Sequence, residues 1–215
     1  MTITTPPEFS SQFMDQLRDL LRWRRDVRHF RPDPVPEPVL DNLLRTACLA
    51  PSVGLSEPWR FVRVDDAARR AAVRADFTRC NEVALADRDG PDALRYARLK
   101  LAGLDDAPHH VAVFSHPDPT QGRGLGRATM PQTTTWSTVM AIHTFWLAAT
   151  AAGVGVGWVS IIDPDRVAAV LDMDPALELV AYLCVGYPAA PASTPELERR
   201  GWEHRAPERR QWIRR

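Results

Sequence analysis

The segment from Gln132 to Ala152 constrains the fold more than any other part of the sequence, because it is apolar around most of a helical circumference. Its large apolar side chains are Trp136, Val139, Met140, Ile142, Phe145, Trp146 and Leu147. A helix with one apolar stripe lies at a surface, whereas a helix that is apolar all round is buried. In a chain of 215 residues this predicts a central helix, covered by a sheet on one side and by a second subunit on another. Within it, His143 is expected to be a hydrogen-bonded core residue.

Hydrophobic periodicity and the positions of proline predict further helices and strands on both sides of this segment. Helices are expected at 10–25, 37–50, 66–79, 91–103 and 163–172, and strands at 59–64, 110–114, 154–160 and 179–185. Residues 118–131 are rich in glycine and proline, which indicates a mobile loop. The tail from Pro195 onward is charged, retains Trp202 and Trp212, and lacks a partner face of its own. It is expected to be an arm that wraps a neighbour.

Charge and cysteine content argue against several classes of protein. The 27 basic and 27 acidic residues balance, so no overall field favours nucleic acid or an anionic membrane as a partner. Cys48, Cys80 and Cys184 are widely spaced, which indicates neither a disulfide framework nor a zinc site, and no metal is expected. The N-terminus lacks the apolar run of a signal peptide, and no window reaches the roughly 20 apolar residues of a membrane span. We therefore expect a soluble, cytoplasmic protein.

Residues 24–30, Arg-Arg-Asp-Val-Arg-His-Phe, place three guanidiniums and one carboxylate at the end of the first predicted helix. Guanidiniums bind phosphate bidentately, so the cluster predicts an anion site. A carboxylate weakens such a site unless it points elsewhere or has chemistry to perform, and Asp26 is therefore the first catalytic candidate. The alternative interpretation is a solvated helix end with one local ion pair.

The glycine-rich run Gly153-Val-Gly-Val-Gly157 lies at the entry to a strand after a helix, whereas the dinucleotide-binding turn lies between a strand and a helix. We interpret these glycines instead as allowing a planar ligand to approach the strand backbone closely. Ser160 at the end of the strand then either bonds the edge of that ligand or is an ordinary strand-end hydroxyl. Lys100 is the only lysine in a chain with 26 arginines, which is either chance under a codon bias or a place where an ammonium is needed.

Seven groups of residues, taken in chain order, match one family pattern. They are Arg24-Arg-Asp-Val-Arg28, Ala50-Pro-Ser-Val-Gly54 with Pro58-Trp59, Leu99-Lys-Leu101, Gly126-Arg127, Trp146-Leu-Ala-Ala149, Gly153-Val-Gly-Val-Gly-Trp-Val-Ser160, and Pro195-Glu-Leu197 with Gly201-Trp202. Together they resemble the BluB family, the 5,6-dimethylbenzimidazole synthases of the nitroreductase-like flavoproteins, over roughly residues 14–205. The arginine-rich start and the Pro-Trp pair are shared with other nitroreductases, whereas Asp26 and Gly-Trp-Val-Ser are more specific.

The resemblance implies an α+β fold with a mixed sheet flanked by helices, in an intertwined homodimer with two FMN sites at the subunit interface. A flexible arm is expected at 1–12, a single FMN-binding domain at 13–215, a lid segment at about 80–105 and a C-terminal arm at about 193–215. The implied reaction is oxygen-dependent fragmentation of reduced FMN to 5,6-dimethylbenzimidazole, the lower ligand of vitamin B12, and D-erythrose 4-phosphate. FMN is then a substrate, dioxygen a co-substrate, and a separate flavin reductase supplies reduced FMN.

The resemblance also implies roles for individual residues, with Asp26 and Ser160 as the catalytic pair. The implied FMN-binding residues are Arg24, Arg25, Asp26, Val27, Arg28, Ser52, Gly54, Leu99, Lys100, Gly157, Ser160 and Arg205. Asp26 is expected to remove a proton from the ribityl carbon next to the ring or to shuttle one at N5. We expect Arg205 to close over the phosphate and Lys100 to stabilise negative charge at N1 or O2 of reduced flavin.

Two positions depart from the wider nitroreductase pattern, which tends to have asparagine and glutamine where this chain has Leu55 and Glu57. Leu55 suits a drier pocket, and Glu57 adds a second carboxylate nearby. The first alternative function is an NAD(P)H-dependent FMN enzyme that recycles its flavin, acting as a reductase of nitroaromatics, quinones, flavin or cob(II)yrinate. The second is a flavin-binding module without turnover.

Overall fold

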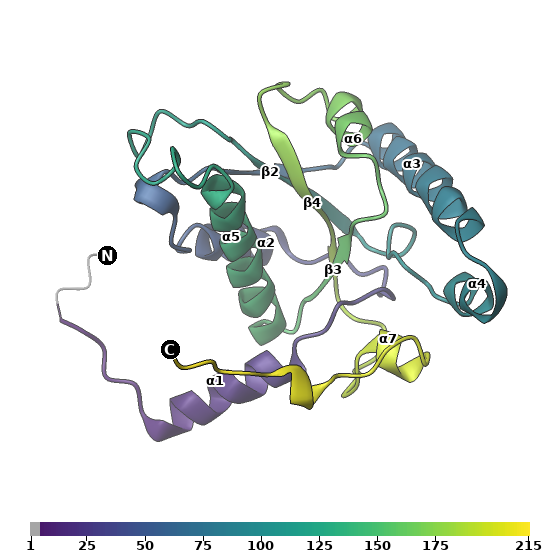
Figure 1. Ribbon diagram of the computed structural model, residues 1–215, viewed down its shortest axis with the longest axis horizontal. Coiled ribbons are helices and arrows are strands. Elements are labelled where there is room, and N and C mark those ends of the chain that lie inside the picture. The colour runs from purple at the N-terminus through teal and green to yellow at the C-terminus, as the bar shows by residue number, and fades with distance from the viewer. Residues whose placement is uncertain (1–4) are drawn as a thin grey trace.

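A sheet of four antiparallel strands lies at the centre of the chain, with helices on both of its faces (Figure 1). The structure is a computed structural model and describes residues 5–215. The elements in chain order are α1 (Ser11–Trp23), α2 (Glu37–Ala47), β1 (Trp59–Arg63), α3 (Ala67–Ala86), α4 (Gly90–Ala97), β2 (His109–Ser115), α5 (Thr133–Ala151), β3 (Gly155–Val159), α6 (Pro164–Val170), β4 (Glu178–Gly186) and α7 (Glu196–Arg199). The predicted α+β architecture is confirmed, and each of the four predicted strands is present.

The strand order β1-β2-β4-β3 makes β2 and β4 the central strands. Successive side chains of a strand point to opposite faces, so Val111 and Val113 of β2 enter one core while Ala112 enters the other. Every strand pair is antiparallel, and among residues 5–215 the parallel component is a single isolated bridge between Asp26 and Val156. The predicted mixed sheet is therefore an antiparallel sheet with one parallel addition.

Helices α2 and α5 cover one face of the sheet, and Phe145 of α5 is fully buried in the core on that face. Within one chain α5 buries only the side that faces the sheet and α2. Three apolar side chains on its other side stay 38–48% exposed, namely Trp136, Val139 and Met140. His143 is also exposed, so the prediction that it is a core residue is wrong.

Helices α3 and α6 cover the opposite face, where Val73 and Val167 are fully buried in the second core. Helix α4 is shorter than predicted and ends at Ala97, because the following segment packs against residues 28–30. At Gly103 a Cβ atom would lie closer than 3.0 Å to the ring of Phe30, so the backbone approaches that ring as only glycine can.

Helix α1 begins at Ser11, where the Ser10 hydroxyl accepts the N–H of Phe13 (3.1 Å), so the predicted arm over 1–12 is shorter than expected. Residues 1–4 of that prediction lie outside the described residues. No residue of α1 is buried within one chain, although its apolar side chains are spaced for a buried face. In the part of the chain described, no helix combines the length and the apolar character needed to cross a membrane.

The C-terminal tail finds a partner within its own chain, which the sequence analysis did not anticipate. The Trp202 ring packs edge-on against Tyr96 of α4, with centroids 6.2 Å apart, and the Arg88 guanidinium lies over both rings. Trp212, further along, is 88% exposed. The tail is thus fixed at its start and free at its end.

The buried pair of His110 and Tyr182 makes stability depend on pH. Burial lowers the pKa of His110 from 6.5 to about 4, and its Nδ1 lies 2.9 Å from the Tyr182 hydroxyl. Below pH 6.5 the unfolded chain binds a proton that the folded chain does not, so stability falls as the pH drops toward 4. We expect the free energy of unfolding to fall by about 2 kcal/mol between pH 7 and pH 5 from this group, measured by urea denaturation. In His110→Gln this pH dependence should shrink, whereas in the exposed control His143→Gln it should persist.

Candidate functional site

The arginine-rich segment leaves the end of α1 and runs as an added strand along β3. The N–H of Val27 donates to the carbonyl of Val156 (3.0 Å), and Asp26 and Val156 form the parallel bridge. On the other side, the indole N–H of Trp146 donates to the carbonyl of Arg25 (3.1 Å). The cluster therefore lies at a helix C-terminus, as predicted, and its backbone is fixed by both β3 and α5.

The Asp26 carboxylate is held by two donors at the edge of β3. Oδ1 accepts the backbone N–H of Trp158 (2.9 Å), and Oδ2 accepts Nε of Arg28 (2.9 Å). The side chain nevertheless remains 33% exposed. Its orientation is fixed while part of its surface stays accessible, which is the condition for a positioned acid or base.

Arg28 connects Asp26 to the segment that follows α4. Its side chain is only 11% exposed, and its Nη1 donates to the carbonyl of Lys100 (3.0 Å). The Lys100 ammonium in turn lies 2.5 Å from Oδ2 of Asp106. A continuous chain of polar contacts therefore joins β3, the arginine segment and the base of the predicted lid. Asp106 was missed by the sequence analysis, because nothing local marks it as the partner of the single lysine.

The remaining arginines have different surroundings from one another. Burial lowers the pKa of Arg24, and the nearby Arg205 lowers it further while Asp26 raises it. The Arg24 guanidinium lies over the Trp146 ring, 4.7 Å from its centroid, and forms no ion pair with residues 5–215. Burial and the approach of Arg205 also lower the pKa of Arg25. Its Nη1 and Nη2 groups donate to the backbone carbonyls of Arg22, Arg24 and Ser193. The structure therefore brings Arg205 to the cluster and leaves Arg24 and Arg205 as its uncommitted cations.

Arg25, Val27 and His29 alternate along the extended segment with Arg24, Asp26 and Arg28, so the two sets face opposite sides. Residues 25–29, Asp26 and Arg28 included, line a cavity of about 390 Å³ that is closed by residues 188–192. Neither Ser160 nor Lys100 lines this cavity. The cavity therefore borders the arginine segment but not Ser160 or Lys100.

The space left by the glycines of β3 is occupied by the protein itself. A Cβ atom at Gly157 would lie closer than 3.0 Å to the carbonyl oxygen of Val27, and one at Gly155 would meet the Val27 side chain at 2.9 Å. At Gly155 and Gly157 the space that we had assigned to a planar ligand is therefore filled by Val27. Their absent side chains instead allow residues 26–28 to cross β3 at close range.

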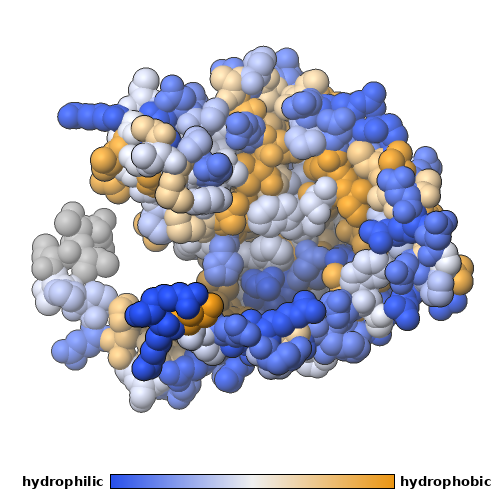
Figure 2. Space-filling view, viewed as in Figure 1, coloured by the Kyte–Doolittle hydropathy of each residue, from blue (hydrophilic) through white to orange (hydrophobic). Residues whose placement is uncertain are grey.

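Ser160 follows the last residue of β3 and is exposed, which leaves its hydroxyl accessible. Leu99 and Lys100 lie after α4 and border a smaller cavity of about 210 Å³ that also contacts α3. Figure 2 shows a hollow with a hydrophilic floor between the layer of α1 with the C-terminal arm and the rest of the molecule.

Ser52 and Gly54 lie in a different region of the same chain. Their loop is bound to the N-terminal part of α5 through the N–H of Val53, which donates to Ser137 Oγ (3.0 Å), whereas Asp26 lies beside Trp146. Nine residues of helix separate those two contacts, about 14 Å along the axis. The structure thus does not bring Ser52 and Gly54 together with Asp26 within one chain.

The same loop holds an unusual backbone. Gly54, Leu55 and Glu57 all have positive φ (58°, 55° and 42°), which costs free energy at the two positions that are not glycine. Leu55 is 77% exposed, and the Glu57 carboxylate accepts Nε2 of Gln121 (3.2 Å). Glu57 therefore has its own partner and is not part of the Asp26 cluster. In the described chain, no three histidine, cysteine or acidic side chains come together in a group able to hold a metal.

Comparison with known proteins gives consistent results. Residues 21–187 match the nitroreductase family model. The chain is 56% identical to a 5,6-dimethylbenzimidazole synthase of Rhodospirillum rubrum, covering 94% of this chain and 96% of the relative. It is 49% identical to a second such synthase, from Rhodobacter capsulatus, covering 96% and 99%. Among solved structures, oxidized iodotyrosine deiodinase bound to FMN and 3-iodo-L-tyrosine has a TM-score of 0.71 at 25% identity and covers 93% of this chain and 97% of that one.

The contact between Gly157 and Val27 yields a prediction about the site. In Gly157→Ala the new methyl group would force residues 26–28 away from β3, so we expect the free energy of unfolding to fall by about 1–3 kcal/mol. We also expect the Asp26 segment to become more susceptible to proteolysis. The comparison is Gly153→Ala, where the positive φ strains the backbone but nothing lies within 4 Å of the added Cβ atom. Equal proteolysis of the Asp26 segment in both variants would show that the close contact is not what holds it.

Proposed function

Because the chain belongs to the nitroreductase family, we propose that it is an enzyme that fragments reduced FMN with dioxygen to 5,6-dimethylbenzimidazole and D-erythrose 4-phosphate. The observation that carries this proposal is the Asp26 carboxylate, held by Trp158 and Arg28 and still partly exposed at the edge of β3. Full-length relatives named 5,6-dimethylbenzimidazole synthase support the same reaction. In this proposal FMN is consumed as the substrate.

The uncommitted cations fit the phosphate of FMN. Arg205 lies close enough to lower the pKa of Arg24, and a phosphate between the two guanidiniums would relieve that repulsion. The cluster follows the C-terminus of α1, where the helix dipole does not attract anions, so the guanidiniums must supply the attraction. The FMN-bound iodotyrosine deiodinase supports a flavin on this fold.

Each proposed catalytic group has a limited task. Reduced flavin itself supplies the reactivity toward dioxygen. Asp26 removes the proton from the ribityl carbon next to the ring, and its two hydrogen bonds fix the direction from which it does so. Ser160 orients the ring through its accessible hydroxyl. Lys100 can reach the flavin only by leaving Asp106, so we propose that flavin entry exchanges one anionic partner of the ammonium for another.

The proposal includes a homodimer that completes each site. Helix α1 buries no residue within one chain, and α5 leaves Trp136, Val139 and Met140 exposed, so two apolar faces lack a partner. A second copy of the chain would cover both faces. It would also bring its own Ser52 and Gly54 to the Asp26 cluster, which the first chain cannot do. We further propose that a separate cytoplasmic flavin reductase supplies the reduced FMN.

Air exposure of the reduced complex tests the reaction. The reduced FMN complex is mixed with air, and the flavin band and the benzimidazole product are followed by absorbance and mass spectrometry. We expect lasting bleaching with the wild-type chain and product formation slowed about 10²–10⁴-fold in Asp26→Asn, because that variant lacks the base. Asp19→Asn, an exposed position on α1, is the control and should react at the wild-type rate. Full return of unchanged yellow FMN with the wild-type chain would favour a flavin-recycling reductase or a module without turnover.

FMN affinity tests the phosphate site. A charge-assisted hydrogen bond to phosphate contributes about 1.5–3 kcal/mol, so Arg24→Ala and Arg205→Ala should each weaken FMN binding about 10- to 100-fold in fluorescence titrations. Riboflavin, which lacks the phosphate, should bind the variants and the wild-type chain alike. Arg18→Ala on the exposed side of α1 serves as the control. Equal loss of riboflavin and FMN affinity would place the arginines away from the phosphate.

A further inference from the structure

Asp76, in the middle of α3, is a buried acidic residue, with 8% of its surface exposed. A buried carboxylate is costly unless donors surround it, so its retention needs an explanation. Burial alone would raise the pKa of Asp76, but the N–H of Asp163 and the guanidiniums of Arg79 and Arg166 together lower it. The group is therefore a charged anchor inside the protein.

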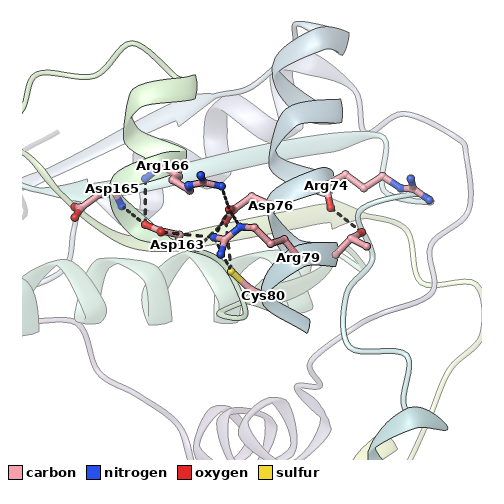
Figure 3. Close-up of polar contacts among 8 residues, drawn as sticks. Arg74, Asp76, Arg79, Cys80, Asp163, Asp165 and Arg166 are labelled. Carbon is pink, nitrogen blue, oxygen red and sulfur yellow. Dashed lines mark hydrogen bonds and ion pairs between the residues drawn. The ribbon is translucent and has the colours of Figure 1, made fainter. Parts of the chain in front are cut away.

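The anchor connects α3 to the start of α6 (Figure 3). Oδ2 of Asp76 accepts the backbone N–H of Asp163 (2.7 Å), and Oδ1 accepts Nη2 of Arg79 (2.6 Å). Arg166 of α6 approaches Oδ1 to 3.9 Å, and the Cys80 thiol approaches Oδ2 to 3.8 Å. Donors from both helices thus converge on one carboxylate.

The tethered residue, Asp163, has its own structural role. Its side chain caps α6 by accepting the N–H groups of Asp165 (3.1 Å) and Arg166 (3.2 Å). Its backbone N–H is therefore the point at which the chain leaving β3 is fastened to α3. Asp76 thus fixes the residue at which α6 begins.

Ser160 lies between two fixed points. On one side, Val159 pairs with Tyr182 in the sheet, and on the other the N–H of Asp163 is held by Asp76. Only Ser160, Ile161 and Ile162 lie between these anchors. The path of a three-residue link is determined by its two ends. If the contact with Asp76 is lost, the pairing of Val159 in the sheet is not enough to fix the conformation of Ser160.

We infer that Asp76 is a positioning residue that acts through Ser160, fixing the turn that presents this hydroxyl to the flavin. The inference rests on the proposed function, because it takes Ser160 to be a flavin contact. Asp76 itself touches no part of the proposed substrate site. Its effect must therefore appear in the orientation of the flavin and in turnover, and not in the phosphate contact that dominates affinity.

The experiment compares Asp76→Ala, Ser160→Ala and the double variant. We expect Asp76→Ala to slow benzimidazole formation from bound reduced FMN about 10-fold, with the FMN dissociation constant changed less than 2-fold. In the Ser160→Ala background, Asp76→Ala should slow the reaction less than 2-fold further, because its effect passes through the serine. A full 10-fold effect in that background would overturn the inference, as would an unchanged rate in Asp76→Ala.

A second readout does not depend on turnover. The absorption band of bound oxidised FMN should shift in the same direction in Asp76→Ala and Ser160→Ala, without a further shift in the double variant. If the wild-type chain binds FMN but forms no benzimidazole, the proposed function fails and this spectrum alone decides the inference. A band that responds to Ser160→Ala but not to Asp76→Ala would overturn it.

Controls separate positioning from general destabilisation. Asp76→Asn keeps an oxygen that can accept the N–H of Asp163, so it should react faster than Asp76→Ala. If Asp76→Ala does not fold, Asp76→Asn is used in its place. Asp105→Asn removes the partner of Arg74, which lies on the same helix as Asp76, and should leave rate and spectrum unchanged. Hydrogen exchange in residues 160–166 should accelerate in Asp76→Ala and not in Asp105→Asn. Equal acceleration in both variants would overturn the inference.

Discussion

The close crossing of Val27 over Gly157 is the contact on which the candidate site depends. The carbonyl of Val27 occupies the space in which any side chain at position 157 would lie, and this allows residues 26–28 to pair with β3. Through that pairing the N–H of Trp158 reaches the Asp26 carboxylate. A missing side chain on one strand therefore determines where an acidic side chain on another segment points.

The three arginines of the segment are chemically alike, but the structure gives each a different task. Arg28 binds the carboxylate, Arg25 binds the backbone carbonyls of Arg22, Arg24 and Ser193, and Arg24 stays uncommitted near Arg205. One short motif thus supplies a structural brace, a partner for the acid and a cation available to an anion.

Local patterns in the sequence predicted much of the fold, because amphipathic spacing and proline positions are local signals. The four strands, α1, α2, α5 and α6 lie where those signals place them, whereas α3 begins as predicted but continues seven residues further, to Ala86. Local signals fail where a contact with a distant segment determines the end of an element. Helix α4 ends early because residues 98–103 pack against Arg28 and Phe30. His143 was misplaced because the helix is also apolar on a side that one chain alone leaves exposed.

For the site, residue types identified Asp26 and the arginines, and the structure brings Arg205 to them. The contacts of Trp158 with Asp26 and of Asp76 with Asp163 could not be found in this way, since each joins segments far apart in the sequence. Asp106 is only six residues from Lys100, but no regular helix or strand spacing pairs the two.

The position of Arg28 couples two segments of the chain. Its guanidinium binds both the Asp26 carboxylate and the backbone carbonyl of Lys100, so neither can shift without disturbing the other. If the chain has the proposed function, a movement of the residues that follow α4 to admit the flavin would also disturb the alignment of the acid. Access to the site and readiness for proton removal would then depend on the same side chain.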